Sequence, residues 1–137
     1  MSLYVDANIL VALFTGDALS ERASSLVAAQ SDTFIVSDVA ALEFSSAVAR
    51  MVRAKVLSPK SAKDTYSDFD LWVGAAESAQ IAATDIEAAT AIVRRFDINL
   101  HGADAIHVAI AMRMSAGLLT LDNKMRSNAR KLGLVVI

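Results

Sequence analysis

The chain has 137 residues, of which 55% are hydrophobic, 6% aromatic and 20% charged, and this length fits one compact domain. A mean hydropathy of +0.44 excludes intrinsic disorder, and the absence of cysteine excludes disulfides, thiolate catalysis and Cys-ligated zinc. The net charge of −2 argues against a protein that coats nucleic acid through a basic surface, but it allows one concentrated acidic site. No apolar run reaches the roughly 18 residues of a membrane helix. The N-terminal MSLYVDANIL lacks the basic region of a secretory signal. Because a chain without cysteine suits a reducing compartment, we expect a cytoplasmic protein.

Short β-branched or leucine-rich segments alternate with alanine-rich segments along residues 1–137, without a linker or repeat, which predicts a single domain. The expected strands are 3–5, 33–36, 80–82 (weak), 117–120 and 135–137. The expected helices are 8–14, 20–30, 38–55, 59–72, 86–96, 103–115 and 123–132. The residues expected to mark helix ends are Ser20, Ser37 or Asp38, Ser58 before Pro59, a Thr84–Glu87 capping box, and Gly133. This alternation predicts an α/β fold, with a small parallel sheet of four or five strands and helices on both faces.

Two aspartates follow expected strands. Asp6 comes directly after the first strand, and Asp122 follows the segment GLLT with one residue between them. Because parallel sheets bind ligands at the carboxyl ends of their strands, both side chains are expected beside a ligand site. Each could instead cap the helix that follows it, which is a frequent role of aspartate.

Two further acids lie in apolar helical surroundings. The neighbours of Glu43 three and four residues away are all small or apolar, and glutamate is rarely buried without a partner. Asp104 opens the apolar helix DAIHVAIAM, so its end of the helix is expected to be enclosed. The alternatives are a Glu43 head group in water and an Asp104 that only complements the helix dipole.

Convergence of these four carboxylates would require compensation of their charge. Two like charges about 4 Å apart repel by roughly 4 kcal/mol at an effective dielectric constant near 20, so some acids stay protonated or a cation lies among them. A site made only of oxygen ligands suits Mg²⁺ or Mn²⁺. Carboxylate-bound Mg²⁺ commonly serves phosphate chemistry.

Four segments in this order resemble a PIN domain, in particular the VapC-type toxins of toxin–antitoxin pairs. They are LYVDANILVAL, SDVAALEFSSAVARMVR, LHGADAIHVAIAM and LLTLDNKMRSNARKLGLVVI, and the resemblance covers nearly the whole chain. It implies a Mg²⁺- or Mn²⁺-dependent ribonuclease, with water activated by the metal attacking an RNA phosphodiester to leave a 5′-phosphate and a 3′-hydroxyl. The residues that match the family's catalytic and metal-binding acids are Asp6, Glu43, Asp104 and Asp122, the last often reaching the metal through water.

The resemblance also implies supporting residues and partners. Asn8 and Thr120 match polar positions that orient ligands or water. The expected partners are an RNA substrate, an antitoxin that covers the acidic crevice with an inserted Arg or Lys, and a second copy of this chain in a homodimer. Residues 56–83 carry no family motif.

Basic residues follow two of the acids. The candidate RNA contacts are Arg50, Arg53, Lys124 and Arg126, and the alternative is a solvated helix face. The histidines are not assigned to catalysis, because His107 is expected to pack or to form hydrogen bonds and His101 to be solvated in a loop.

Two other functions stay open at this stage. A haloacid-dehalogenase-like phosphatase also has an Asp after its first strand, but it needs a second Asp where this chain has Asn8. A PIN-like module could bind RNA or protein without cutting, although all four acids are present.

Overall fold

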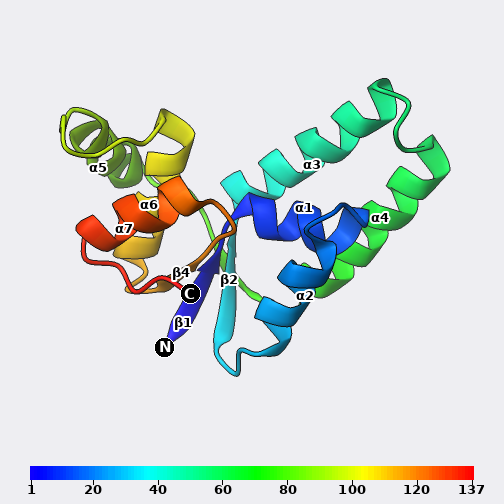
Figure 1. Ribbon diagram of the computed structural model, residues 1–137, viewed down its shortest axis with the longest axis horizontal. Coiled ribbons are helices and arrows are strands. Elements are labelled where there is room, and N and C mark those ends of the chain that lie inside the picture. The colour runs from blue at the N-terminus through cyan, green and yellow to red at the C-terminus, as the bar shows by residue number, and fades with distance from the viewer.

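The computed structural model describes residues 1–137 and is built around a parallel sheet of four strands in the order β3-β2-β1-β4 (Figure 1). The strands are β1 (Ser2–Val5), β2 (Thr33–Ser37), β3 (Glu77–Ala79) and β4 (Gly117–Leu119). Strand β1 is central, and its Tyr4 pairs with Ile35 of β2 on one side and with Leu118 of β4 on the other. The expected α/β fold with a small parallel sheet is therefore confirmed.

Seven helices cover the two faces of the sheet. They are α1 (Ala7–Thr15), α2 (Ser20–Ala28), α3 (Asp38–Arg53), α4 (Pro59–Val73), α5 (Ala83–Val93), α6 (Gly102–Arg113) and α7 (Asn123–Lys131). Figure 1 shows α1 to α4 on one side of the sheet and α5 to α7 on the other. None of these helices is both long and apolar enough to span a lipid bilayer.

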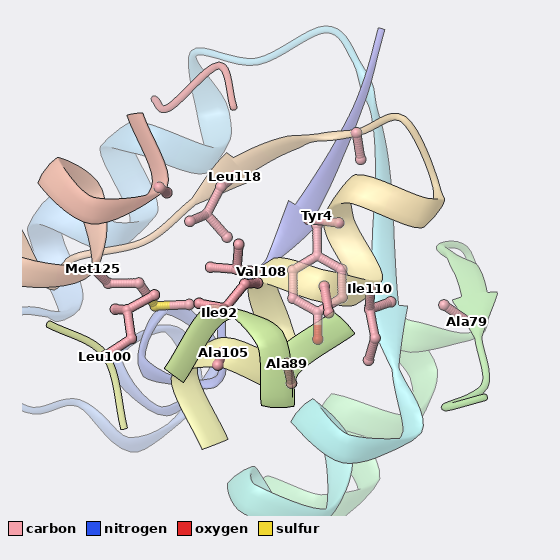
Figure 2. Close-up of a cluster of buried hydrophobic side chains, with 14 of the residues drawn as sticks. Tyr4, Ala79, Ala89, Ile92, Leu100, Ala105, Val108, Ile110, Leu118 and Met125 are labelled. Atoms are coloured by element: carbon pink, nitrogen blue, oxygen red, sulfur yellow. The ribbon is translucent and has the colours of Figure 1, made fainter. Parts of the chain in front are cut away.

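The alternation of side chains along the strands creates two separate cores. Tyr4, Ile35 and Leu118 belong to the core beneath α5 to α7, which Figure 2 shows in close-up. The following residues, Val5, Val36 and Leu119, belong to the core beneath α1 to α4. Successive residues of a strand point to opposite faces, so these buried strands supply apolar side chains to both layers, as parallel sheets require.

Several expected helix ends are confirmed. The Ser37 hydroxyl accepts a hydrogen bond from the Ala40 amide and starts α3. The Ser58 hydroxyl accepts one from Ser61, and Pro59 is the first residue of α4. Gly133 follows α7 with a φ of 89°, a left-handed conformation that favours glycine. Ser20 is different: it is the first residue of α2, and its side chain does not cap the helix.

The expectations for residues 77–96 are wrong in detail. The strand lies at Glu77–Ala79 instead of 80–82, because β2 ends opposite Ala79 and Asp38 accepts a hydrogen bond from the Ile81 amide beyond that point. The expected Thr84–Glu87 capping box does not form. Instead, Asp85 accepts a hydrogen bond of 2.7 Å from the Ala82 amide, so α5 starts earlier and ends at Val93.

The expected last strand, 135–137, is reduced to one isolated bridge between Leu118 and Val136. The other expected elements agree with the structure to within about two residues at each end, which is the usual uncertainty of helix boundaries. The carboxyl ends of β1, β2 and β4 meet at one edge of the sheet, and Asp6 extends this edge through its amide, which donates to the Leu119 carbonyl at 3.0 Å.

Candidate active site

Asp6 is a buried carboxylate at the end of the central strand. Its residue is 6% exposed and it forms no ion pair. Its Oδ2 accepts a hydrogen bond of 2.7 Å from the hydroxyl of Thr120, which directly follows β4 and is fully buried. Burial raises the pKa of Asp6, and this effect outweighs the charge of His107 and the Thr120 hydrogen bond, both of which lower that pKa. The fold thus holds a poorly compensated carboxyl group at this edge.

Asn8 and Thr120 form a brace beside Asp6. The Asn8 side-chain nitrogen donates to the Thr120 hydroxyl oxygen at 3.1 Å, and its amide oxygen accepts from the Leu121 backbone at 3.2 Å. The Asp122 amide also donates to the Thr120 hydroxyl, at 3.1 Å. These contacts join the first turn of α1 to the loop after β4, so the structure brings Asp6, Asn8 and Thr120 together.

Glu43 reaches this edge from the second turn of α3. Its Oε1 lies 2.9 Å from Nε2 of His107, a fully buried residue of α6, while the Glu43 side chain remains 38% exposed. The charge of Glu43 is close enough to raise the pKa of Asp6. A hollow of about 390 Å³ opens beside Glu43, and Asn8 and Arg50 also line it.

Asp104 lies half-buried in the first turn of α6, three residues before His107. Burial lowers the pKa of His107, but the hydrogen bond to Glu43 and the charges of Asp6, Glu43 and Asp104 outweigh that effect, so its pKa lies above its ordinary value. The charges of three of the four acids therefore act on the pKa of His107. No group of three carboxylates or histidines is nevertheless close enough to form a preassembled metal cluster.

Asp122 differs from the other three acids. It is exposed, and its Oδ1 accepts hydrogen bonds from the amides of Lys124 at 2.8 Å and Met125 at 3.1 Å. Its carboxylate thus caps α7, and its backbone amide contacts Thr120 beside Asp6. The alternative role considered from the sequence, a cap on the helix that follows Asp122, is the role of its side chain in this structure.

The four candidate RNA contacts are not equivalent. Arg50 lines the hollow beside Glu43, whereas Arg53 lies three residues further along α3, about 15 Å from Glu43 along the helix axis. Arg126 donates to the carbonyls of Thr120 and Ile137 at 3.3 and 2.8 Å, so it holds the C-terminal residue. The Lys124 side chain forms no hydrogen bond or ion pair with any of the four acids.

Sequence reasoning missed one contributor, Tyr4. Its hydroxyl lies 2.5 Å from both Ser37 Oγ and His107 Nδ1, and it points from β1 into the core beneath α5 to α7 (Figure 2). Strand alternation could have placed Tyr4 on the face opposite Leu3 and Val5, but no local pattern pairs it with His107. The expectation that His107 forms hydrogen bonds agrees with this arrangement.

Comparison with known proteins identifies the family. The sequence model of the PIN domain matches residues 3–131. The chain belongs to the PIN domain family. A search of curated proteins by sequence gave no significant match.

Solved structures show the same PIN fold over the whole chain. The toxin VapC20 of Mycobacterium tuberculosis, described as cleaving the sarcin–ricin loop, has a TM-score of 0.72 at 18% identity, covering 97% of this chain and 96% of that chain. VapBC2 of Rickettsia felis, solved with a DNA fragment from its promoter, has a TM-score of 0.73 at 15% identity, covering 100% and 98%. A toxin–antitoxin complex of Klebsiella pneumoniae has a TM-score of 0.69 at 22% identity, covering 100% and 96%.

Proposed function

We propose that this PIN domain is a divalent-cation-dependent endoribonuclease and the toxin of a VapBC-type toxin–antitoxin pair. The observation that carries the proposal is Asp6, a buried acid without an ion-pair partner, at the sheet edge where Glu43 contacts His107. The charges of Asp6, Glu43 and Asp104 all raise the pKa of that histidine. Membership of the PIN family and the fold shared with VapC20 support the same reading. Both favour a nuclease over the phosphatase alternative. Asn8, where a phosphatase would need a second Asp, instead holds the loop after β4.

The donor chemistry of the site fits Mg²⁺ or Mn²⁺. Asp6, Glu43 and Asp104 offer only oxygen atoms, which hard divalent cations prefer, and both ring nitrogens of His107 are already occupied by Tyr4 and Glu43. A cation would also compensate the charge that burial disfavours on Asp6. We therefore propose these three carboxylates as direct ligands and Asp122 as a ligand that acts through water.

The chain's own residues have distinct roles in this proposal. A bound cation would activate water and stabilise negative charge on an RNA phosphodiester. The Thr120 hydroxyl orients Asp6, and Asn8 in turn orients Thr120. Arg50 lines the hollow beside Glu43, and we propose that it binds a phosphate of the substrate. Arg53, Lys124 and Arg126 remain proposed RNA contacts of lower rank.

RNA cleavage tests the proposal. Wild-type protein should cut structured RNA with Mg²⁺ or Mn²⁺ and leave it intact with EDTA, and Asp6→Asn should leave it intact throughout. Asp64→Asn makes the same chemical change at an exposed residue of α4 and should cut like the wild type. Intact RNA in every reaction, across several substrates, would leave the non-cleaving binding module as the function.

The proposed partners have separate tests. A small DNA-binding protein encoded next to this chain is the expected antitoxin, and its complex should lose nuclease activity. Exposed apolar side chains, including Leu42 at 67% and Leu71 at 82%, are compatible with the proposed homodimer. Light scattering at high concentration should give the mass of a dimer, and the mass of a monomer would contradict that part.

A further inference from the structure

A buried line of side chains leads to Glu43 from the junction of β2 and α3, through β1 and then α6. Ser37 Oγ contacts the Tyr4 hydroxyl, Tyr4 contacts Nδ1 of His107, and Nε2 of His107 contacts Oε1 of Glu43, at 2.5, 2.5 and 2.9 Å. Ser37, Tyr4 and His107 are each no more than 1% exposed. The order of contacts runs from the start of α3, across β1, to α6 and back to α3.

The hydrogen atoms of this line can be assigned by counting donors and acceptors. The Glu43 carboxylate can only accept, so Nε2 of His107 carries a hydrogen and donates it to Oε1 of Glu43. In the neutral imidazole, Nδ1 therefore has no hydrogen and accepts from the Tyr4 hydroxyl, and Ser37 donates to the Tyr4 oxygen. In the protonated imidazole, Nδ1 also carries a hydrogen and donates to Tyr4, which then donates to Ser37. Both charge states keep the bond from Nε2 to Glu43.

We propose that His107 is a positioning residue that fixes the Glu43 carboxylate for cation binding, with Tyr4 and Ser37 fixing His107 in turn. The inference rests on the proposed function, because it assigns Glu43 to the cation site. Glutamate loses much rotamer freedom when it is held in one place, and Glu43 is partly exposed, so without the His107 contact its carboxylate would be free to turn into water. Hydrogen-bonding partners of metal ligands typically change metal affinity by about 10–100-fold.

The same line couples the cap of α3 to the site. Ser37 starts α3 and Glu43 lies six residues later on that helix, so both ends of the line belong to one rigid element. His107 joins this element to α6, which also carries Asp104.

Two amide substitutions separate positioning from packing. His107→Gln places an amide N–H near the position of Nε2 and can still donate to Glu43. His107→Asn places its amide near Nδ1 and can contact only Tyr4. Both variants lose the imidazole ring and should lose similar stability in urea. Mn²⁺ affinity, measured without RNA by electron paramagnetic resonance of the free ion, should stay close to wild type in His107→Gln and fall about 10–100-fold in His107→Asn.

Further arms keep the outcomes distinct. Asp85→Asn breaks the ion pair between Asp85 and Arg113, which lies away from the site. This variant should lose stability without losing Mn²⁺ affinity. If both His107 variants fail to fold, Tyr4→Phe, which frees Nδ1 of His107, should still weaken Mn²⁺ binding. If His107→Asn binds Mn²⁺ as tightly as the wild type, the positioning role alone is overturned. The same holds for Tyr4→Phe where that variant is used. No Mn²⁺ binding by the wild type would overturn the cation site and this inference with it.

Discussion

Replacing Thr120 with valine should expose how much the protein depends on one hydroxyl. Thr120→Val keeps the shape of the side chain but removes the 2.7 Å hydrogen bond to Asp6 and the acceptor for Asn8 and the Asp122 amide. A hydrogen bond to a charged group contributes about 1.5–3 kcal/mol, and a neutral one about 0.5–1.5 kcal/mol. Asn8 and Asp122 can both reach water, so we expect a loss of about 2–4 kcal/mol in the free energy of unfolding. For a domain of this size this lowers Tm by about 6–12 °C.

The pH dependence of this loss identifies its cause. The Thr120 hydroxyl stabilises the charged form of Asp6 and lowers its pKa, so its contribution is largest where Asp6 is ionised and falls when Asp6 is protonated. Urea unfolding, measured from neutral pH down to a pH at which Asp6 is protonated, should show the stability of Thr120→Val approaching that of the wild type at low pH. Thr120→Ser, which keeps the hydroxyl, is the control. A Thr120→Val variant as stable as Thr120→Ser at neutral pH, or a loss independent of pH, would refute the reasoning.

Three other predictions follow from the same contacts. Because folding raises the pKa of Asp6, the free energy of unfolding falls as pH rises from the unfolded-state pKa to the folded-state pKa, and the full penalty persists above it. Asp6→Asn should therefore raise Tm of the cation-free protein at neutral pH. A lower Tm would contradict this. Asp122→Ala removes the cap of α7 and should cost about 1 kcal/mol in the free energy of unfolding, measured in urea. RNA cleavage should fall less than in Asp6→Asn, and an equal fall would contradict the lesser role given to Asp122. The hydrogen bond from Arg113 lowers the pKa of Asp85, so this pair stabilises the fold above the unfolded pKa and the effect is lost as pH falls through the folded pKa. Asp85→Asn should thus cost about 1–3 kcal/mol at neutral pH and much less in acid, and a constant cost would argue against the pair.

Local patterns predicted the parts of the fold that local forces determine. The serine and proline at positions 58 and 59 start a helix because a cap and a fixed φ act within one turn. Strand β3 was misplaced because three residues carry little periodic signal and its position depends on pairing with β2. Asp85 replaced the expected capping box for a similar reason, since Arg113, 28 residues away, holds its carboxylate.

The candidate site shows the same division. Asp6 could be placed from the sequence because it directly follows the central strand. The contact between His107 and Glu43 spans 64 residues, and that between Tyr4 and His107 spans 103. Such contacts arise from packing α6 over β1 beside the start of α3, and no spacing within one segment reports them. The sequence therefore indicated which acids to consider but not which hydrogen bonds hold them.

X-ray diffraction from crystals soaked in Mn²⁺, recorded where manganese scatters anomalously, tests the central claim most directly. The account predicts a strong anomalous peak bound by the carboxylates of Asp6, Glu43 and Asp104, and its loss in Asp6→Asn crystals. The exposed control Asp64→Asn should keep the peak. No peak at this edge of the sheet, or a peak that persists without the Asp6 carboxylate, would contradict the account.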